Sequence, residues 1–563
     1  MGIVVTSKAR CRDCYKCIRH CPVKAVGLKD GQAWVVAEKC ILCGQCIQAC
    51  PQKAKSTVSQ VEKFQGMLAA GESVNVSLAP SYLASTHYRN PWKLVAGLYK
   101  TGVARVEETA VAAEWVAATY GEAVASKAKE TLISSCCPVV VNLIEKNYPE
   151  LIEYLPGLVS PMIAHTRKVK AVYPGSKTVF IGPCFAKKAE AQSETMLDAV
   201  LTFEELFEFF EISGIDPDNL GDRFPDQVSA RARSFPLKEG TLKAAGLNDQ
   251  FALDILSVSG LDECMETLDD LAKGLIRPRF IEALACKGGC VGGPALGSGN
   301  GFAAGRERIF RYTGLNLEAA QDNNEPPPLQ RSHGPSYLRH VPPTEAEIRE
   351  ILLLTGKEKP EDETNCGGCG YASCREKAIA VFQGLAEPEM CVPYMKNKAE
   401  SFSNTIVEST LNAIIVVNQD LVIQKSNPAA IRMFKLPKNG AVGNPLSRYL
   451  NSTDFQNVLS TQKIFAGLRS YPEYTISTRQ MIYPVPKYGI VIGIITDITM
   501  EETRKAKFDK MRREAFDRAS KVIHEQMRTA QEIAGLLGES TAETKATLLE
   551  LMEIMDGESS NEL

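Results

Sequence analysis

The sequence predicts a multidomain chain with α+β and α/β parts. Its 563 residues are enough for about three to four domains. Strand and helix patterns alternate in two separate parts of the chain, which is typical of mixed folds. Seventeen of the 18 cysteines fall into spaced groups, and only Cys264 stands alone. We expect Cys264 to behave as a small buried apolar residue.

The composition excludes several classes of protein. Hydrophobic residues make up 44% and charged residues 23%, as in ordinary globular proteins. The net charge of −3 gives no electrostatic footprint for nucleic acid or an anionic membrane. No apolar run reaches the ~18 residues of a membrane span, and no signal-peptide pattern opens the chain, so we expect a cytoplasmic protein. In that setting cysteines bind metals more often than they form disulfides.

The first 60 residues repeat one cysteine pattern twice, each time with a proline after the fourth cysteine. The pattern resembles the bacterial ferredoxin run for two [4Fe–4S] clusters, in which the fourth cysteine of each run binds the other cluster. Zinc knuckles are the alternative, but they rarely need three close cysteines twice. We expect residues 1–60 to relay electrons. The ferredoxin pattern assigns Cys11, Cys14, Cys17 and Cys50 to one cluster, and Cys40, Cys43, Cys46 and Cys21 to the other.

Residues 61–318 have the pattern of an α/β domain with cysteines in three segments, 134–138, 181–188 and 282–293. Residues 178–182 form a buried strand pattern, so Cys184 lies at a strand tip, where α/β folds place their chemistry. If Cys286 opens a helical turn, its sulfur and that of Cys290 lie on one face. The glycines around Cys290 leave room for a bulky group beside its sulfur. We expect Lys188 to be solvated.

These three segments resemble, in order and separation, the signature loops of the [FeFe]-hydrogenase catalytic domain. The resemblance implies an H-cluster, which is a [4Fe–4S] unit joined to a two-iron unit that carries CO, CN⁻ and a dithiolate. It implies that Cys136 donates protons and that Lys187 bonds to a cyanide. Ser160, in the family's Ser-Pro-Gln position, is a third candidate catalytic residue. The ligands that the resemblance implies are Cys137, Cys184, Cys286 and Cys290, with Cys290 bridging the two units.

The sequence departs from the family around these loops. Several residues that the family carries there are replaced in this chain. They are methionines, a glutamine, a Gly-Trp pair, the end of the third loop and the acidic start of the proton path. Such neighbours tune a metal site strongly, so we expect an H-cluster that assembles but turns over slowly. The replacements are Gly182, Leu284, Met162, Val139-Val140, Pro294-Ala295 and, by an alignment made by eye, Ala118-Thr119-Tyr120.

A linker and a small four-cysteine domain come next. Residues 319–343 are rich in proline and predict an extended linker. Thr344 and Glu347 form a capping-box pattern that opens a domain over residues 344–400. Its four cysteines fit either [4Fe–4S] or zinc, and we favour the cluster because other clusters are expected. The segment also resembles the small [4Fe–4S] domain of iron–sulfur regulators and corrinoid proteins. Its cysteines are Cys366, Cys369, Cys374 and Cys391.

Residues 401–500 contain an Asn-Pro-Ala-Ala step at 427–430 and a strand pattern that ends in Asp-Ile-Thr at 497–499. In both features they resemble a PAS domain. They lack cysteine and histidine, so the usual haem-linked chemistry is not expected, and we interpret the domain as an interaction or dimerisation module. Residues 501–563 predict a helical signalling or dimerisation segment, because apolar residues recur at three- and four-residue steps. His524 on this helix has no kinase segment after it, so we expect a solvated histidine.

These features together predict a sensory [FeFe]-hydrogenase of a PAS-containing subgroup. It would carry out slow H2 and proton chemistry, relay electrons through [4Fe–4S] clusters, and pass the redox state through the PAS domain and last helix. We expect a homodimer, a redox partner and a downstream signalling protein. One alternative is a catalytic hydrogenase subunit of a redox complex. The other is a non-catalytic iron–sulfur scaffold, against which the retained Cys136, Lys187 and four ligand cysteines argue.

Overall fold

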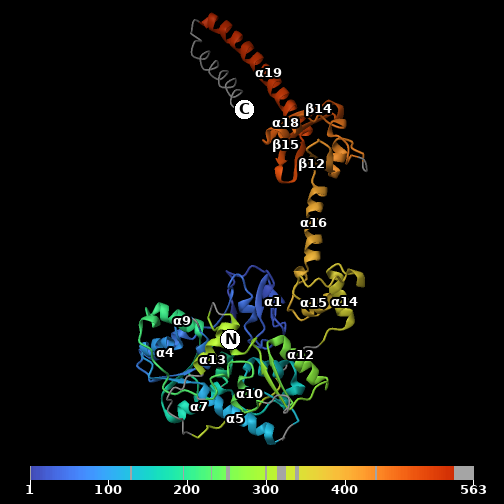
Figure 1. Ribbon diagram of the computed structural model, residues 1–563. Helices are drawn as coiled ribbons and strands as arrows, with labels where there is room; N and C mark the ends of the chain where they lie inside the picture. Colours follow the sequence, from blue (N-terminus) through green and yellow to red (C-terminus); the bar gives the residue numbers. More distant parts are fainter. Residues whose placement is uncertain are drawn as a thin grey trace. The chain divides into compact units, whose positions relative to one another are not determined.

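The computed structural model divides into two compact units, residues 1–395 and 396–563 (Figure 1). Helix α16 (Val392–Ser409) contains the boundary between them, so the predicted domain limit at residue 400 falls inside a helix. Residues 2–537 are described except 86, 127–129, 194–195, 230, 249–253, 298–300, 314–324, 337–341 and 438–440.

The first 60 residues form a small α+β module with internal symmetry. Strand β1 (Val4–Thr6) pairs antiparallel with β4 (Lys55–Thr57), and β2 (Val26–Lys29) pairs antiparallel with β3 (Gln32–Val35). Two short helices, α1 (Lys16–Arg19) and α2 (Gln45–Gln48), carry the third cysteine of each run.

The two cysteine runs share one backbone path. Residues two, four and thirteen positions after the first cysteine are left-handed in both runs. Few residues other than glycine adopt this conformation without strain, so the repeated pattern reflects a requirement to turn the chain sharply around a shared centre. The matched pairs are Asp13 and Leu42, Tyr15 and Gly44, and Lys24 and Lys53.

Two parallel sheets form the core of the next domain. One has the strand order β6-β5-β8-β9, and the other has the order β10-β11-β7. Parallel strands need crossover connections, and helices supply most of them here. The strands are β5 (Val74–Leu78), β6 (Arg105–Glu108), β7 (Leu132–Ile133), β8 (Lys177–Gly182), β9 (Ala199–Thr202), β10 (Ile255–Ser259) and β11 (Phe280–Leu284).

Helices cover these sheets, and α5 packs against both α7 and α10 (Figure 1). Strand β5 alternates Val74, Val76 and Leu78, and Pro91 is the first residue of α4, where its fixed φ is compatible with a helix start. The helices are α3 (Val61–Ala69), α4 (Pro91–Lys100), α5 (Ala110–Ser126), α6 (Pro138–Asn147), α7 (Pro161–Val172), α8 (Ala186–Gln192), α9 (Phe203–Ile212), α10 (Gly240–Ala244), α12 (Leu261–Ala272) and α13 (Phe302–Thr313).

The described part of the predicted linker, residues 325–336 and 342–343, is extended where it meets the α/β domain. The Val159 amide donates to the Leu329 carbonyl at 2.8 Å, and the Arg331 amide donates to the Gly157 carbonyl at 3.0 Å. The segment is therefore held on the domain rather than free, a docking that composition does not encode.

The four-cysteine segment follows with α14 (Glu345–Leu354) and α15 (Cys374–Phe382). Thr344 forms the expected capping box with Glu347, and the Ser373 side chain caps α15 by accepting from the Glu376 amide. The segment shares one hydrophobic cluster with the ferredoxin-like module, and in Figure 1 its helices lie beside α1.

The second unit has the predicted PAS architecture. Its antiparallel sheet has the order β13-β12-β16-β15-β14, with helices packed on it. The last helix exposes apolar side chains such as Met511 and Ile533, and residues 538–563 lie outside the described part. The elements are β12 (Ala413–Asn418), β13 (Ile423–Ser426), α17 (Pro428–Met433), α18 (Thr453–Thr461), β14 (Phe465–Tyr471), β15 (Ile476–Val485), β16 (Ile490–Asp497) and α19 (Thr499–Leu537).

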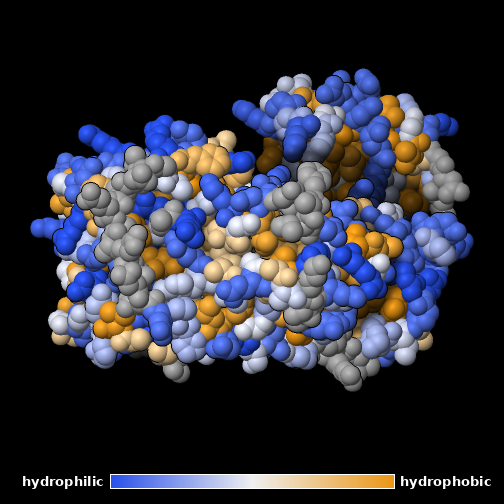
Figure 2. Space-filling model, turned by 60° about the horizontal axis from the view of Figure 1, so that its bottom comes forward, coloured by the Kyte–Doolittle hydropathy of each residue, from blue (hydrophilic) through white to orange (hydrophobic). Residues whose placement is uncertain are grey.

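The face shown in Figure 2 intersperses apolar residues among hydrophilic ones. Among the described helices, none is both long and apolar enough to span a membrane.

A buried ion pair anchors the end of β6 beside the active-site loops. The Arg233 guanidinium donates to both oxygens of the Glu108 carboxylate, at 2.9 and 3.1 Å, and both side chains are almost fully buried. The hydroxyl of Tyr82 donates to the same carboxylate at 2.8 Å. Removing one partner of such a pair leaves a buried, unpaired charge.

We expect Arg233→Met to reduce the stability of this domain by about 3–5 kcal/mol. Arg311→Met is the matched control, because Arg311 pairs with Glu307 on the exposed face of α13 and such pairs contribute about 0–1 kcal/mol. Thermal unfolding of the cluster-loaded chain measures both. Equal shifts for the two variants would contradict a structural role for the buried pair.

Candidate active site

Three loops meet where parallel strands end. Strand β7 leads into Cys136 and Cys137, β8 leads into Cys184, and β11 leads into Cys286. The first two loops run directly into α6 and α8, so their cysteines lie between a strand tip and a helix start. Chemistry at the carboxyl ends of parallel strands is usual for α/β folds, and here two sheets contribute loops to one place.

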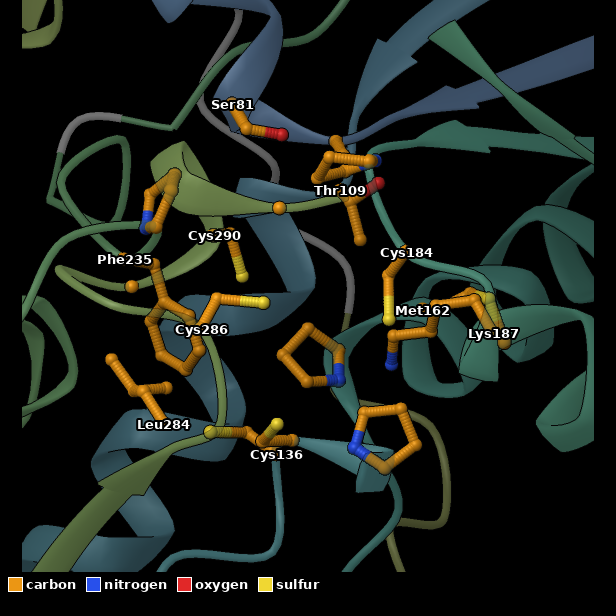
Figure 3. Close-up of a pocket in the computed structure, with 18 of the residues that line it drawn as sticks. Ser81, Thr109, Cys136, Met162, Cys184, Lys187, Phe235, Leu284, Cys286 and Cys290 are labelled. Atoms are coloured by element: carbon orange, nitrogen blue, oxygen red, sulfur yellow. The ribbon is translucent and has the colours of Figure 1, made fainter. Parts of the chain in front are cut away.

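The loops line one mainly apolar cavity with a volume of about 100 Å³. This is several times the ~10–15 Å³ that one water needs. Figure 3 shows the side chains of Cys136, Cys184, Cys286 and Cys290 turned toward the same space. The structure thus brings together the predicted site residues Cys136, Cys137, Cys184, Lys187, Cys286 and Cys290.

The third loop is a sharp turn, not the helical turn that the Cys286–Cys290 spacing allowed. Gly288 and Gly289 both have positive φ, at 76° and 95°. A Cβ on Gly289 would lie 2.2 Å from the Pro236 carbonyl oxygen. These glycines therefore serve backbone packing behind Cys290 as well as turning the chain, and helical spacing was the wrong geometry for this loop.

Burial and mutual repulsion disfavour thiolates here. Burial, and then the charges of Cys137 and Glu282, raise the pKa of Cys136 to about 12. Burial, followed by Cys137, raises the pKa of Cys184 to about 11. Burial and the neighbouring thiols Cys137 and Cys184 also raise the pKa of Cys290.

These thiols fit a cluster of several irons. Cysteine sulfur is a soft ligand that selects iron–sulfur centres, zinc or copper. Four thiols from three loops line a cavity large enough for more than one atom. Cationic iron among them would offset the repulsion that raises their pKa values. The donor set and the space therefore both suit an H-cluster.

Cys136 lies among groups that the sequence analysis did not single out. Glu282, on β11, is fully buried, and its carboxylate accepts from the backbone amides of Glu239 and Thr241 at 2.6 and 2.9 Å. The Ser257 hydroxyl also donates to it, at 2.5 Å. Burial raises the pKa of Glu282 despite these hydrogen bonds.

Tyr120 lies at the position aligned by eye with the family's acidic helix. Its hydroxyl accepts from the Ser135 amide at 3.0 Å and lies 3.1 Å from the Ser135 hydroxyl. The ring is fully buried. A neutral phenol thus fills this side of the first loop.

The two lysines after the second loop are both buried. Lys187 lines the cavity, and its Nζ lies 2.7 Å from the Glu190 carboxylate, which Arg331 of the extended segment also contacts at 3.3 Å. Lys188 pairs with Glu205 at 2.6 Å and donates to the Val58 carbonyl. The expectation that Lys188 is solvated was wrong, because helix α8 turns it toward a carboxylate of α9.

Ser160 does not line the cavity. It is fully buried at the start of α7, and its hydroxyl has no hydrogen-bond partner among the described residues. Its neighbours Pro161 and Met162 do line the cavity. Because Ser160 itself does not line the cavity, its catalytic role stays a prediction.

The replaced residues leave the cavity wall apolar. Met162, Val139 and Leu284 line it, whereas Gly182 does not. A Cβ on Gly182 would lie 2.7 Å from the ring of Phe180, which itself lines the cavity. Phe180 therefore occupies the space that a side chain at position 182 would need.

The ferredoxin-like module brings its cysteines together as the spacing predicts. Cys11, Cys14, Cys17 and Cys50 line one small cavity, and we call them the outer group. Cys21 is among the neighbours that raise the pKa of Cys40, Cys43 and Cys46, after burial, and we call these four the inner group. Backbone amides of Ala25 and Ala54 donate to the sulfurs of Cys21 and Cys50. Such donors stabilise anionic clusters.

The inner group lies beside the catalytic loops. Cys43 packs in the same hydrophobic cluster as Cys137 and Cys184. Gly44 has φ of 79°, and a Cβ there would lie 2.7 Å from the Phe185 ring and 2.9 Å from Pro294. Only glycine permits this approach, so Gly44 sets how closely the two modules meet.

The four-cysteine segment surrounds its thiols with buried cations. Lys357 is buried with its Nζ 3.8 Å from the Cys391 sulfur. Lys377 is also buried, and burial lowers its pKa while Cys391 and Cys369 oppose that effect. Two buried lysines beside four cysteines suit an anionic thiolate cluster.

Family models match each of these parts. Residues 71–294 match the iron-only hydrogenase large subunit, C-terminal domain. Over these residues the chain is similar to [FeFe]-hydrogenases. Residues 10–55 match a 4Fe-4S dicluster domain, residues 362–393 an Fe-S cluster model, and residues 402–469 the PAS fold. The protein is thus a hydrogenase-like iron–sulfur protein with a PAS domain, and its family supports an oxidoreductase.

Three curated relatives show how the family match extends. The periplasmic [Fe] hydrogenase large subunit of Nitratidesulfovibrio vulgaris is 28% identical over 390 residues, 57% of this chain and 93% of that protein. The NADP-reducing hydrogenase subunit HndD of Solidesulfovibrio fructosivorans is 23% identical over 58% of this chain and 62% of its own length. The cytosolic Fe-S cluster assembly factor NAR1 of Encephalitozoon cuniculi is 28% identical over 31% of this chain and 54% of its own length.

The sequence analysis missed several residues of the site. One of them had a signal: Glu190 lies three residues after Lys187 on a helix, so their side-chain pair was foreseeable from spacing. The others had none. Arg331, Thr241 and Phe235 come from distant segments, and only the fold brings them to the cavity or its rim.

We expect Cys184→Ala to lose about four irons per chain, the content of one [4Fe–4S] unit, because the side chain lines the cavity. Cys264→Ala is the matched control, since Cys264 is buried in the core and its thiol donates to the Leu284 carbonyl. Iron and sulfide analysis of the purified proteins measures both. Full iron content in Cys184→Ala would contradict its assignment as a ligand.

Proposed function

We propose that this protein is a hydrogen sensor that carries out slow, reversible H2 and proton chemistry at an H-cluster. One observation carries the proposal. Four thiols from three separate loops, together with Cys136 and Lys187, line one buried apolar cavity. We assign Cys137, Cys184, Cys286 and Cys290 as the residues that hold the cluster.

An H-cluster, when bound, supplies the metal chemistry that forms and splits H2. The chain itself supplies three other functions. The apolar wall of Met162, Leu284 and Phe180 excludes water, which strengthens electrostatic contacts inside. Cys136 presents a thiol at the cavity, where its Sγ can hold and release a proton. The Lys187 ammonium has three donors, so it can bind Glu190 and an anionic ligand together.

The surroundings of Cys136 support low turnover. Tyr120 replaces an acidic residue at the aligned position, and Ser135 occupies its hydroxyl. The charge of Glu282 contributes to the raised pKa of Cys136, and three donors already bind the Glu282 carboxylate. Proton exchange with solvent therefore has few relay groups, which favours a site that reports H2 rather than one that processes it quickly.

The connection to the second unit supports a sensory role. Helix α16 starts at Val392, one residue after Cys391, and the Met395 amide donates to the Cys391 carbonyl. The same helix continues to Ser409, close in sequence to the first PAS strand, β12. A change at the four-cysteine cluster would thus act on the first turn of a helix that leads to the PAS domain.

Two alternatives have specific support. Similarity to an NADP-reducing hydrogenase subunit favours a catalytic subunit that works with a redox partner. Similarity to a cytosolic Fe-S cluster assembly factor favours a scaffold without hydrogen chemistry. Neither alternative function explains the PAS unit. A scaffold would also have no need of Cys136 and Lys187 at the cavity.

Infrared spectroscopy of the cofactor-matured chain under N2 and then under trace H2 tests the proposal. We expect CO and CN⁻ bands that shift under H2, together with a turnover rate about 100-fold or more below that of a fast family member, as expected when proton relays are missing. Bands with fast turnover would favour the catalytic subunit. Absence of bands beside intact [4Fe–4S] spectra would favour the scaffold.

Cys136→Ala separates cofactor binding from proton transfer in the same experiment. Because Cys136 is not among the assigned ligands, we expect the bands under N2 to persist. Their response to H2 should slow by about 10²–10⁴-fold, the usual contribution of a positioned acid. An unchanged response would exclude Cys136 as the proton donor.

Helix α16 carries an exposed apolar stripe at heptad spacing, with steps of three and four residues. This spacing is typical of helices that pair in a coiled coil. It supports the homodimer that the PAS domain and last helix already predicted, and adds α16 to the interface. The stripe consists of Val392, Met395, Ala399, Phe402 and Ile406.

Phe402→Glu should therefore raise the dissociation constant of the dimer by about 100-fold, because a charge would be buried at the helix pair. Phe310→Glu is the matched control, since Phe310 is an exposed aromatic residue on α13, outside the stripe. Sedimentation velocity across a concentration series measures both. An equal effect of the two substitutions, or none, would contradict pairing through α16.

A further inference from the structure

The four-cysteine segment is fixed on the ferredoxin-like module by main-chain contacts. The Leu28 amide donates to the Leu385 carbonyl at 2.9 Å, and the Lys24 ammonium donates to the Gly370 carbonyl at 2.8 Å. Gly370 has φ of 96°, and a Cβ there would lie 3.0 Å from Ile18. The contact is therefore close, and its geometry is set by backbone atoms.

Tyr371 lies at the centre of this contact with an unused donor. Its side chain is 4% exposed and packs in the hydrophobic cluster that also contains Cys21 and Cys369. The Lys24 ammonium lies 5.9 Å from the ring centroid. The Tyr371 hydroxyl has no hydrogen-bond partner among the described residues. A buried donor left unpaired costs about 1–3 kcal/mol, so this hydroxyl calls for an acceptor.

Sulfur on either side can be that acceptor. Tyr371 packs in one hydrophobic cluster with Cys369 of the four-cysteine segment and Cys21 of the inner group. A cysteine of each group therefore belongs to the cluster that surrounds the phenol. Hydrogen bonds to cluster sulfurs are a known means of setting the reduction potential.

Cys21 belongs to the group that lies beside the active site. Its partner Cys43 packs with Cys137 and Cys184, and Gly44 meets Phe185 of the second loop. The four-cysteine segment shares one hydrophobic cluster with Cys21 of the inner group, and Cys17 of the outer group belongs to the same cluster.

We propose that the electron relay forks at the inner group, and that Tyr371 joins this group to the four-cysteine segment by donating its O–H to a cluster sulfur. One electron leaves the inner cluster, which is oxidised, and enters the cluster of the four-cysteine segment, which is reduced. No proton moves and no bond changes. H2 as the source of that electron rests on the proposed function.

The fork separates two destinations for electrons. The outer group, which includes the exposed Cys14, remains available to an external redox partner. The four-cysteine cluster instead holds its electron next to Cys391, at the first turn of α16. Signalling and electron exchange with a partner then use different branches.

One contact favours a competing route. The Arg19 guanidinium donates to the carbonyls of both Cys14 and Gly368, at 3.0 and 3.1 Å. This residue therefore links the outer group's loop to the four-cysteine segment. A linear relay through the outer group would use this side of the contact, and the second experiment below distinguishes the two routes.

The first experiment is a redox titration, followed by electron paramagnetic resonance, of the full chain loaded with [4Fe–4S] clusters but without the two-iron unit. Removing the donor in Tyr371→Phe should disfavour the reduced, more negative form of one cluster. At the wild-type midpoint we expect its ratio of reduced to oxidised cluster to fall about tenfold, the effect of one hydrogen bond to a charged group.

Tyr471→Phe is the matched control, because Tyr471 is a buried tyrosine of the PAS domain whose hydroxyl accepts from Gln480. It should leave every midpoint unchanged. Unchanged midpoints in Tyr371→Phe, with full iron content, would overturn the role of Tyr371.

The second experiment removes the outer cluster with Cys14→Ala, in the same preparation. The fork predicts that the four-cysteine and inner clusters, reduced with dithionite, keep the magnetic coupling between their signals. Loss of the coupling, or of rapid reduction of the four-cysteine cluster, would establish the linear route instead. Neither experiment uses H2, so a negative result here is distinct from failure of the proposed hydrogen chemistry.

Discussion

The crowding of buried sulfur is the constraint on which the structure of the first unit depends. Thiolates that share a centre repel one another, and burial removes the water that would screen them. The chain meets this constraint with backbone rather than with counter-charge alone. Left-handed residues turn the cysteine runs around a centre, and amides of Ala25 and Ala54 donate to sulfur. The catalytic loops leave strand ends, where the backbone is free to converge.

Close approach between modules also depends on backbone conformation. Gly44 and Gly370 both have positive φ, and a Cβ at either position would meet a neighbouring module. One glycine sets the contact between the inner group and the catalytic loops, and the other sets the contact with the four-cysteine segment. Because electron exchange weakens steeply with distance, these two positions matter more for function than their lack of side chain suggests.

The candidate active-site cavity combines a polar centre with an apolar wall. The cysteines and Lys187 meet at the cavity, whereas Met162, Leu284 and Phe180 make its wall apolar. The ring of Phe180 also occupies the space that a side chain at position 182 would need. A cavity with few polar neighbours suits the slow chemistry proposed here, and helix α16, which follows Cys391 of the four-cysteine segment, suits the proposed signal.

The sequence alone determined the cysteine grouping, the helix start at Thr344, and the resemblance to the [FeFe]-hydrogenase catalytic domain. The first two follow from local spacing and capping chemistry, which act within a few residues. Only the tertiary structure decided that Lys188 is buried, that Arg331 reaches Glu190, and that Tyr371 packs in one cluster with Cys21 and Cys369. Such contacts join residues far apart in the chain, and no local pattern encodes them, because which side chains meet depends on how whole modules pack.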